Sequence, residues 1–362
     1  MKGFTMKTKK EKTEFTPTPI CIVGEKEECM QNQYGRQITK STASRKLMWG
    51  FTIVELLTVM AVIAMLLGIL VPSLNLVRKL AKDTNQRAQF HGIDVGIETY
   101  SSENNGQYPD SSFSGTVATN GLTVGAQKLA EALIGRDMLG FDPVTSWDAD
   151  IDKDNDDVYA SVTVKGSSAT QETESLDRRQ GPYLNIEKTD AFQVGQLFTD
   201  TTIGAGNVYD GVTVSPAAPA PVLTDTYRVK KIVMGGKTVM AGTPILYYKA
   251  NISSRLFPDT NSVDKISDTN APGYIYNSMD NEDIIDLGTL KDQNIKQHFD
   301  GIDPVYEVDT TTNRDGRWLF YDTITNKQIT SQARPFNSDS YILMSAGYDG
   351  IYGTRDDIYN FD

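Results

Sequence analysis

The chain has few of the side chains on which catalysis and metal binding most often depend. It holds two cysteines and two histidines among 362 residues, and no G-x-S-x-G, P-loop or G-x-G-x-x-G motif. His91 falls in an amphipathic pattern and His298 in a polar stretch, where histidines are more often structural or exposed than catalytic. These absences predict that the protein is not an enzyme.

Both cysteines, Cys21 and Cys29, lie within the first 50 residues, and their spacing matches no common metal-binding pattern. If those residues are removed, the remaining chain cannot form disulfides, even in an oxidising compartment. Residues 1–49 have no strong periodicity and are predicted to be disordered. The sequence leaves open whether translation starts at Met1, Met30 or Met48.

Charge is distributed unevenly along the chain, whose formal net charge is −12. Residues 1–50 contain ten Lys and Arg against five Asp and Glu, whereas residues 51–362 contain 25 against 42. An acidic main part argues against nucleic acid as a partner, because phosphate binding relies on clustered Lys and Arg. It is compatible with divalent cations.

One long hydrophobic run interrupts this polar sequence. It extends from Phe51 to Val71, about 21 residues, with Glu55 as its single charge, and is long enough to cross the roughly 30 Å hydrocarbon core of a bilayer. Arg45 and Lys46 precede it, which predicts a cytoplasmic amino end. A carboxylate at the centre of such a run costs about 2.5–3.5 kcal/mol, so Glu55 requires a partner.

Two simpler interpretations explain this run less well. A secretory signal peptide has a core of about 7–15 residues before a small-residue cleavage site, and Val71-Pro72-Ser73 is a poor site because of its proline. A plain transmembrane anchor remains an alternative. It leaves both Glu55 and the Gly50-Phe51 junction without a role.

Gly50, Phe51, Thr52 and Glu55 match, in place, the pattern Gly then Phe-Thr-x-x-Glu before an apolar helix. The segment thereby resembles the type III signal of prepilins and of type II secretion pseudopilins. Pro72 falls where many members of that family carry a helix-kinking proline. The resemblance implies that a prepilin peptidase cuts between Gly50 and Phe51 and that the new amino group is methylated.

Helical spacing continues beyond Pro72 through Ala88, Ile93 and Ile97. We therefore expect one helix over residues 52–102, roughly 75 Å long, with a bend near Gly68–Pro72. Its first half would span lipid and its second half would pack on a globular head. The Asn-Gly-x-Tyr-Pro sequence at 105–109 resembles the helix exit of major pseudopilins.

The expected fold class is α+β, with the long amino-terminal helix packed on an antiparallel, pilin-like sheet. Other expected elements are a helix at 125–139 and strands at 161–165, 227–234, 238–240, 244–250, 318–321 and 340–344. The segments between them are expected to form a loop at 141–160, an exposed stretch at 166–180, a turn at 181–184, a Pro-rich linker at 215–222, and loops with short helical pieces at 251–300.

This pattern divides the chain into a leader (1–50), a membrane and assembly helix (51–105) and a head (106–362). The head is about twice as large as a typical pseudopilin head. The resemblance covers residues 50–140 and 316–361 best, so the stretch of about 166–315 is interpreted as an enlargement.

The carboxyl-terminal run contains Asp349, Asp356 and Asp357 with three glycines between or beside them. Calcium takes about six to eight oxygen ligands, and a Gly-rich loop lets the backbone curl around the ion. Without a cation these carboxylates would repel one another. An acidic, solvated turn is the alternative interpretation.

This run also resembles the calcium loop of major pseudopilins. The resemblance implies side-chain ligands from Asp349, Asp356 and Asp357 and backbone carbonyl ligands from Ala346 and Thr354. A second acidic run, at 148–157, alternates Asp as an EF-hand loop does. It lacks the glycine at the sixth position and the glutamate at the twelfth, so a solvated loop is favoured over weak cation binding.

These resemblances imply a structural subunit of a pilin-like filament, most closely a major pseudopilin of a type II secretion system. The implied partners are the prepilin peptidase, other copies of the chain, minor pseudopilins, and an inner-membrane assembly platform with its ATPase. The subunit would cross the inner membrane once, with its head in the periplasm. A type IV pilus subunit or surface adhesin is the alternative, and a membrane-anchored enzyme is a third interpretation.

Overall fold

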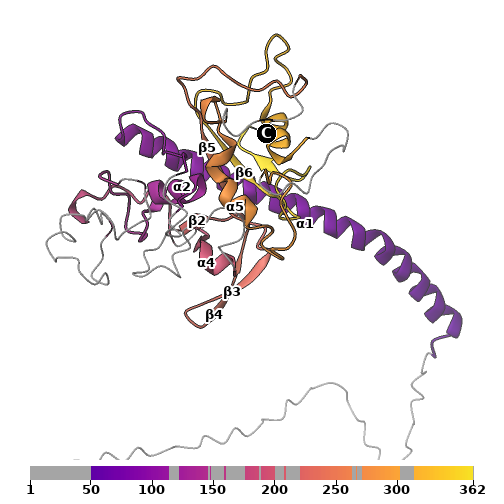
Figure 1. The fold of residues 1–362 in the computed structure, drawn as a ribbon. Coiled ribbons are helices and arrows are strands. Elements are labelled where there is room, and N and C mark those ends of the chain that lie inside the picture. Colours follow the sequence, from indigo (N-terminus) through magenta and orange to yellow (C-terminus); the bar gives the residue numbers. More distant parts are fainter. Residues whose placement is uncertain are drawn as a thin grey trace, which may run out of the picture. The chain divides into compact units, whose positions relative to one another are not determined.

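The computed structural model combines helices with small antiparallel sheets, which confirms the predicted class at the level of α+β (Figure 1). The chain divides into two units, Met1–Ile63 and Ala64–Asp362, which are described separately. The structure describes residues 50–113, 122–145, 147, 159, 176–186, 189–199, 208, 221–262, 266, 271–301 and 314–361.

Helix α1 (Ile53–Glu103) is continuous over 51 residues, so the predicted limits are confirmed to within one residue. Pro72 lies inside the helix without ending it, and the predicted bend stays a prediction. The helix ends where Asn105 and Gly106 take positive φ values of 56° and 75°. These two residue types enter the left-handed region at the lowest cost, and the Gly106 amide closes the last turn on the Ser101 carbonyl.

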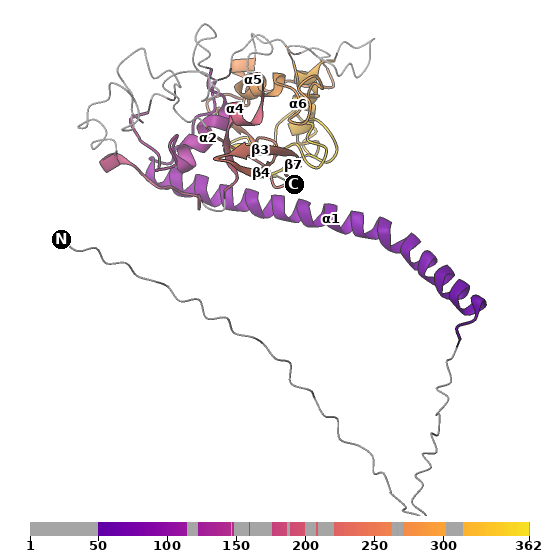
Figure 2. The ribbon, with the colours of Figure 1, turned by 90° about the horizontal axis from the view of Figure 1, so that it is seen from below.

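The second half of α1 buries one face against the rest of its unit (Figure 2). The buried positions recur every three or four residues: Gln86, Phe90, Ile93, Gly96, Ile97, Tyr100 and Ser101. Ala88, expected on this face, is exposed. Gln86 is buried instead, because its side-chain oxygen accepts hydrogen bonds from the Thr226 amide (2.9 Å) and hydroxyl (3.2 Å).

Helix α2 (Gly125–Ile134) begins where predicted but ends five residues before Leu139. Gly135 stops it with a φ of 79°, and a Cβ there would lie 2.0 Å from the Gly140 carbonyl oxygen. All ten residues of α2 are buried, not only the predicted apolar face. Its two charged residues tolerate this because Lys128 pairs with Asp110 at 2.7 Å and Glu131 with Arg136 at 3.0 Å.

Among the described residues, the strands form three small antiparallel sheets. Strands β5 (Leu246–Lys249), β6 (Tyr341–Ser345) and β7 (Ile358–Tyr359) form the largest, in the order β5-β6-β7. The others pair β1 (Ala191–Gln193) with β2 (Pro221–Leu223), and β3 (Lys230–Met234) with β4 (Lys237–Ala241). The predicted strands at 227–234, 238–240, 244–250 and 340–344 are confirmed with shifted ends.

Several predicted segments have different outcomes. The strand expected at 161–165 and the acidic run at 148–157 lie outside the described residues. The end of the expected linker at 215–222 forms part of β2. Strand β5, inside the stretch interpreted as an enlargement, pairs directly with β6, so that stretch supplies part of the largest sheet.

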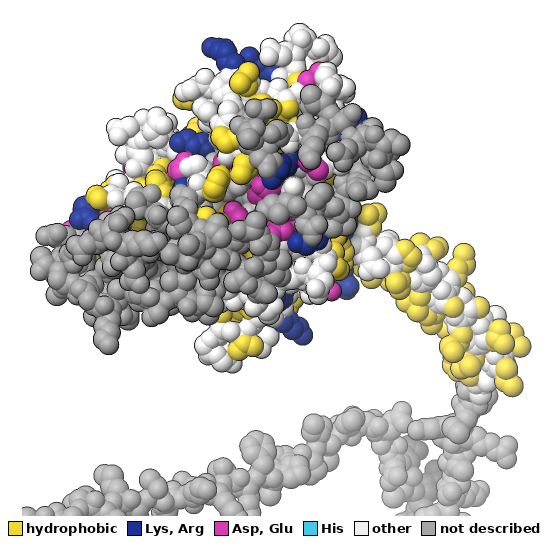
Figure 3. Space-filling model, in the orientation of Figure 1, with side chains coloured by type: hydrophobic (Ala, Val, Ile, Leu, Met, Phe, Trp, Pro, Cys, Tyr) yellow, Lys and Arg dark blue, Asp and Glu magenta, His cyan; other side chains and the backbone are white. Residues whose placement is uncertain are grey.

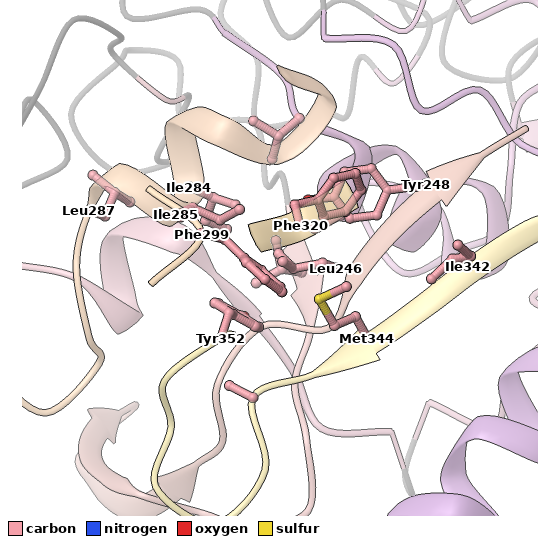
Figure 4. Packing of buried hydrophobic residues seen from close by; sticks show 14 of the residues in the cluster. Leu246, Tyr248, Ile284, Ile285, Leu287, Phe299, Phe320, Ile342, Met344 and Tyr352 are labelled. Atoms are coloured by element: carbon pink, nitrogen blue, oxygen red, sulfur yellow. The ribbon is translucent and has the colours of Figure 1, made fainter. Parts of the chain in front are cut away.

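Alternating side chains of this sheet enter two separate cores. Tyr248, Ile342 and Met344 face one cluster, where they meet Phe320 and Phe299 (Figure 4). Their strand neighbours face the other cluster, against α1 and α2: Tyr247, Tyr341 and Leu343. Because successive strand residues point to opposite faces, one short sheet serves both cores.

The strand predicted at 318–321 is wrong, since these residues belong to helix α6 (Gly316–Ile324). A short apolar run does not distinguish a strand from a buried helix by periodicity alone. Asp315 decides the outcome, because its carboxylate accepts the Trp318 amide at 2.9 Å and caps the helix. The expected short helical pieces in 251–300 are confirmed as η2 (Ala271–Gly273), η3 (Ser278–Asn281) and α5 (Glu282–Asp286).

We expect Asp315→Ala to lower the free energy of unfolding by about 1 kcal/mol, the typical value of a lost N-cap. Asp315→Asn should cost less, because an asparagine oxygen can accept the same amide hydrogen bond. Chemical denaturation of the purified protein measures both values. Equal losses in the two variants would contradict a capping role.

The stretch at 166–180, expected to be exposed, is buried in part. The Arg179 side chain is 5 % exposed and bonds Asp137 at 2.9 Å, while Arg178 bonds the buried Asp142 at 3.0 Å. Gln180 exchanges backbone hydrogen bonds with Phe141. Ion pairing between segments distant in sequence therefore draws this polar stretch into the fold.

Candidate functional site

The first candidate site is the beginning of α1. The Thr52 hydroxyl accepts the Glu55 amide (3.2 Å), and a Glu55 carboxylate oxygen accepts the Thr52 amide (3.0 Å) and hydroxyl (2.9 Å). This reciprocal pattern is a capping box, which satisfies two amides that the helix leaves unpaired. Glu55 thus has a local role that the sequence analysis did not identify.

Only one oxygen of the Glu55 carboxylate is used in this box. Among the residues that the structure describes, Oε1 has no hydrogen bond and Glu55 has no ion pair. One carboxylate oxygen at the helix end can therefore bind a further donor without breaking the cap.

Gly50 precedes this cap in open space. A Cβ added there would meet nothing within 4 Å, and its backbone is not in the left-handed region. Packing therefore does not require glycine at position 50. If glycine is required at position 50, the requirement comes from another molecule that acts on the chain.

Within the described residues, nothing covers the apolar part of α1. An 18-residue window with a mean hydropathy of 2.7 has none of its residues buried, and Figure 3 shows many hydrophobic side chains on the surface of this helix. By length and composition α1 can cross a membrane. This exposure would be costly in water, so lipid or other protein must cover it.

The second candidate site is the segment between β6 and β7, which contains the five predicted calcium ligands. Ala346 directly follows β6, and Asp349, Thr354, Asp356 and Asp357 lie in the loop. Gly347 allows the chain to reverse here. Its φ is 64°, and a Cβ would lie 2.0 Å from the Asp356 carbonyl oxygen.

Backbone amides satisfy one oxygen of each loop carboxylate. Asp356 Oδ2 accepts the Tyr348 (2.8 Å) and Asp349 (3.0 Å) amides, Asp349 Oδ1 accepts the Ile351 amide (2.8 Å), and Asp357 Oδ2 accepts the Gly353 amide (2.7 Å). The Thr354 hydroxyl faces the other oxygens of Asp356 (2.8 Å) and Asp357 (3.4 Å). One hydroxyl proton cannot serve both carboxylates at once.

The protonation behaviour of the loop reflects this crowding. Burial raises the pKa of Asp357 to about 7. Burial also raises the pKa of Asp349, with the nearby Asp356 charge adding to the effect. Burial opposes ionisation of Asp356 as well, but the Thr354 hydroxyl and the Asp349 amide outweigh it and lower the pKa. Two of three carboxyls thus resist ionisation.

Within the described part of the chain, no group of three or more His, Cys, Asp or Glu side chains is arranged to hold a metal. The amide hydrogen bonds explain this for the loop, because they turn carboxylate oxygens toward the backbone. The donor set is nevertheless the oxygen-rich set that calcium prefers.

The fold places basic side chains of α1 beside this loop. The positive charge of Lys79 lowers the pKa of Asp356, and Lys82 Nζ lies 5.3 Å from the centre of the Tyr348 ring. Lys82 also donates to the Tyr227 carbonyl at 3.1 Å. The sequence did not predict these neighbours, because only tertiary packing brings α1 to the loop.

Comparison with family models, with curated proteins and with solved structures found no match. The interpretation of both sites therefore depends on their own geometry and on the sequence motifs.

A third feature, an open cavity of about 450 Å³, lies where the chain leaves α1. Tyr108, Asp110, Lys249 and Asp280 are among its lining residues. Two of its three lining carboxylates have partners, since Asp110 pairs with Lys128 and Asp280 accepts the Ser111 hydroxyl at 2.6 Å. Nothing in this arrangement calls for a ligand.

Proposed function

We propose that this protein is a pilin-like filament subunit, most closely a major pseudopilin of a type II secretion system. The observation that carries the proposal is the Gly50-Phe51-Thr52-x-x-Glu55 sequence at the start of a long apolar helix that no described part of the chain covers. The exposed hydrophobic surface supports insertion in lipid before assembly and packing against neighbouring helices afterwards.

Processing supplies the partner that Glu55 lacks. Cleavage by the prepilin peptidase after Gly50 creates a positively charged amino group on Phe51. We infer that this amino group on one copy pairs with Glu55 of an adjacent copy in the filament. The capping box supports the inference, because it holds the carboxylate at the helix end and leaves Oε1 available. A charge pair in a dry helical core would set the register between copies.

The remaining partners follow from the same proposal. Before assembly, the subunit would reside in the inner membrane with its head in the periplasm. An assembly platform with its ATPase would then drive it into the filament together with minor pseudopilins. Calcium bound by the β6–β7 loop would hold the crowded carboxylates together in the head. No step in this mechanism requires the protein to act as an enzyme.

The proposal is tested by the mature amino terminus. We expect mass analysis of membrane material to find the chain beginning at a methylated Phe51. An untrimmed chain, or a start at any other residue, would contradict the proposal.

Gly50→Ser, or a bulkier residue at this position, should leave the leader attached, because the peptidase would have to accept a side chain at the cut. Gly68→Ser is the matched control, since a Cβ there also meets nothing within 4 Å. It should be processed normally. The fraction of leader-free protein, read by mass on intact chains, compares the two, and a mature Phe51 terminus in the Gly50 variant would refute the assignment.

A further inference from the structure

The hairpin formed by β3 and β4 lies in the longest stretch of residues 51–362 without a carboxylate. Residues 226–258 contain no Asp or Glu but six basic residues: Arg228, Lys230, Lys231, Lys237, Lys249 and Arg255. Residues 51–362 as a whole hold 42 acidic residues against 25 basic ones. The hairpin is therefore a basic element on an acidic protein.

One face of this hairpin packs on the head. Ile232 and its cross-strand neighbour Val239 join the hydrophobic core that also contains Leu197. Lys230 lies on the same face and donates its Nζ proton to the Leu197 carbonyl. This packing holds the hairpin in place and determines which side chains face outward.

The opposite face is free. Lys231 pairs with Met240 and Val233 with Thr238, so these four side chains share that face. Val233 is 73 % exposed and Met240 37 %. Lys231 is exposed on this face. Lys237, at the tip, is also exposed, but it pairs with Met234 and so starts from the other face; neither lysine has an ion pair within the described ranges. An apolar centre with a polar rim is the usual anatomy of an interaction surface, and here the polar groups at the edge include these two lysines.

We propose that this outward face of the hairpin binds an acidic surface on a second copy of the chain. Copies with a strongly negative net charge repel one another when packed side by side. A basic projection from each copy onto the acidic head of the next reduces that repulsion and favours one orientation. The proposal rests on the proposed function only in that a filament brings copies together.

The charge also determines the symmetry of the contact. A two-fold contact through the hairpin would place lysines against lysines, so the hairpin cannot be its own partner. It must meet a different surface of the neighbour. Such a heterologous contact gives a ring if its rotation closes and a continuing filament if it does not, and the proposed filament requires the second case.

Charge reversal in the full-length chain tests the contact. Lys231→Glu combined with Lys237→Glu should reduce filament yield by about tenfold or more, because each change places like charges together. Lys231→Arg should retain wild-type yield. Lys327→Glu is the control for charge, since this lysine is 70 % exposed and distant in sequence from the hairpin. It should leave the yield nearly unchanged.

A zero-length carbodiimide cross-link identifies the partner directly, because it joins an amine only to a carboxylate in contact with it. Filaments assembled from mixed heavy- and light-isotope copies should yield Lys231 or Lys237 joined to an Asp or Glu of the other isotope. Three results would refute the contact: links within one copy only, links to another protein, or no link at all. They would refute it even if the double variant lost filament yield, since binding of the hairpin to anionic lipid would predict that combination.

The two proposals fail differently. If the wild-type protein forms no filament, the proposed function is wrong. If it does, and the double variant assembles equally well, only the hairpin contact is wrong.

Discussion

Glu55→Gln should reduce filament incorporation about a hundredfold or more while leaving cleavage after Gly50 intact. Removing one partner of a buried charge pair costs about 3–5 kcal/mol, since the other charge remains buried without compensation. Here the Phe51 amino group would lose its counter-charge in the filament core. Sheared filaments and the membrane fraction, compared by quantitative immunoblot, give the incorporated fraction.

Glutamine is the informative substitution because Glu55 caps the helix in the structure and also carries the charge on which the proposed pairing depends. A Gln at the third helical position can still accept the Thr52 amide, so Glu55→Gln keeps the capping box and removes only the charge. Glu55→Val removes both. If Gln assembles like the wild type while Val does not, the residue acts as a helix cap and the charge-pairing mechanism is wrong.

Millimolar calcium should raise the melting temperature of the mature protein in detergent by about 5 °C or more. A ligand present at a hundred times its dissociation constant stabilises the folded state by about 2.7 kcal/mol. In a large domain, 1 kcal/mol of stability corresponds to about 2–4 °C in melting temperature. The physical source is the neutralisation of Asp349, Asp356 and Asp357, which lie together in one loop. Chelator should reverse the shift.

Two controls separate binding from general charge screening. Asp349→Asn should abolish the calcium shift, whereas Asp259→Asn should retain it. Asp259 is a matched control, because its carboxylate also accepts a backbone amide two residues on, at 3.0 Å, but lies in an exposed turn of another segment. Magnesium at the same concentration should give a smaller shift, since it demands a more regular octahedral site. No calcium shift would remove the metal from the proposal.

Features that depend on neighbouring residues could be predicted well. The limits of α1 follow from an apolar run, helical spacing and an Asn-Gly stop, all within one segment. The four main strands follow from Val-, Ile- and Tyr-rich runs. The Thr-x-x-Glu spacing also indicates the capping box at Thr52 and Glu55, although the only role predicted for Glu55 was in assembly.

Features that depend on residues distant in the sequence could not be predicted. The run at 318–321 has strand-like composition, and the Asp315 cap together with burial against Tyr248 made it a helix. Arg179 belongs to a polar stretch, yet pairing with Asp137 buries it. Beta strands of two or three residues, such as β1 and β7, exist only because a partner strand passes beside them.

The amino-acid sequence alone determined four features, because each is local in the chain. They are the apolar helix, the Gly50-Phe51 junction before it, the single acidic residue Glu55 within it, and the three aspartates near the carboxyl end. Tertiary packing decided the rest. It turned the loop carboxylates toward backbone amides, set Lys79 and Lys82 beside them, and pointed one face of the β3–β4 hairpin outward. These outcomes depend on which surfaces meet, and periodicity within a segment carries no information about that.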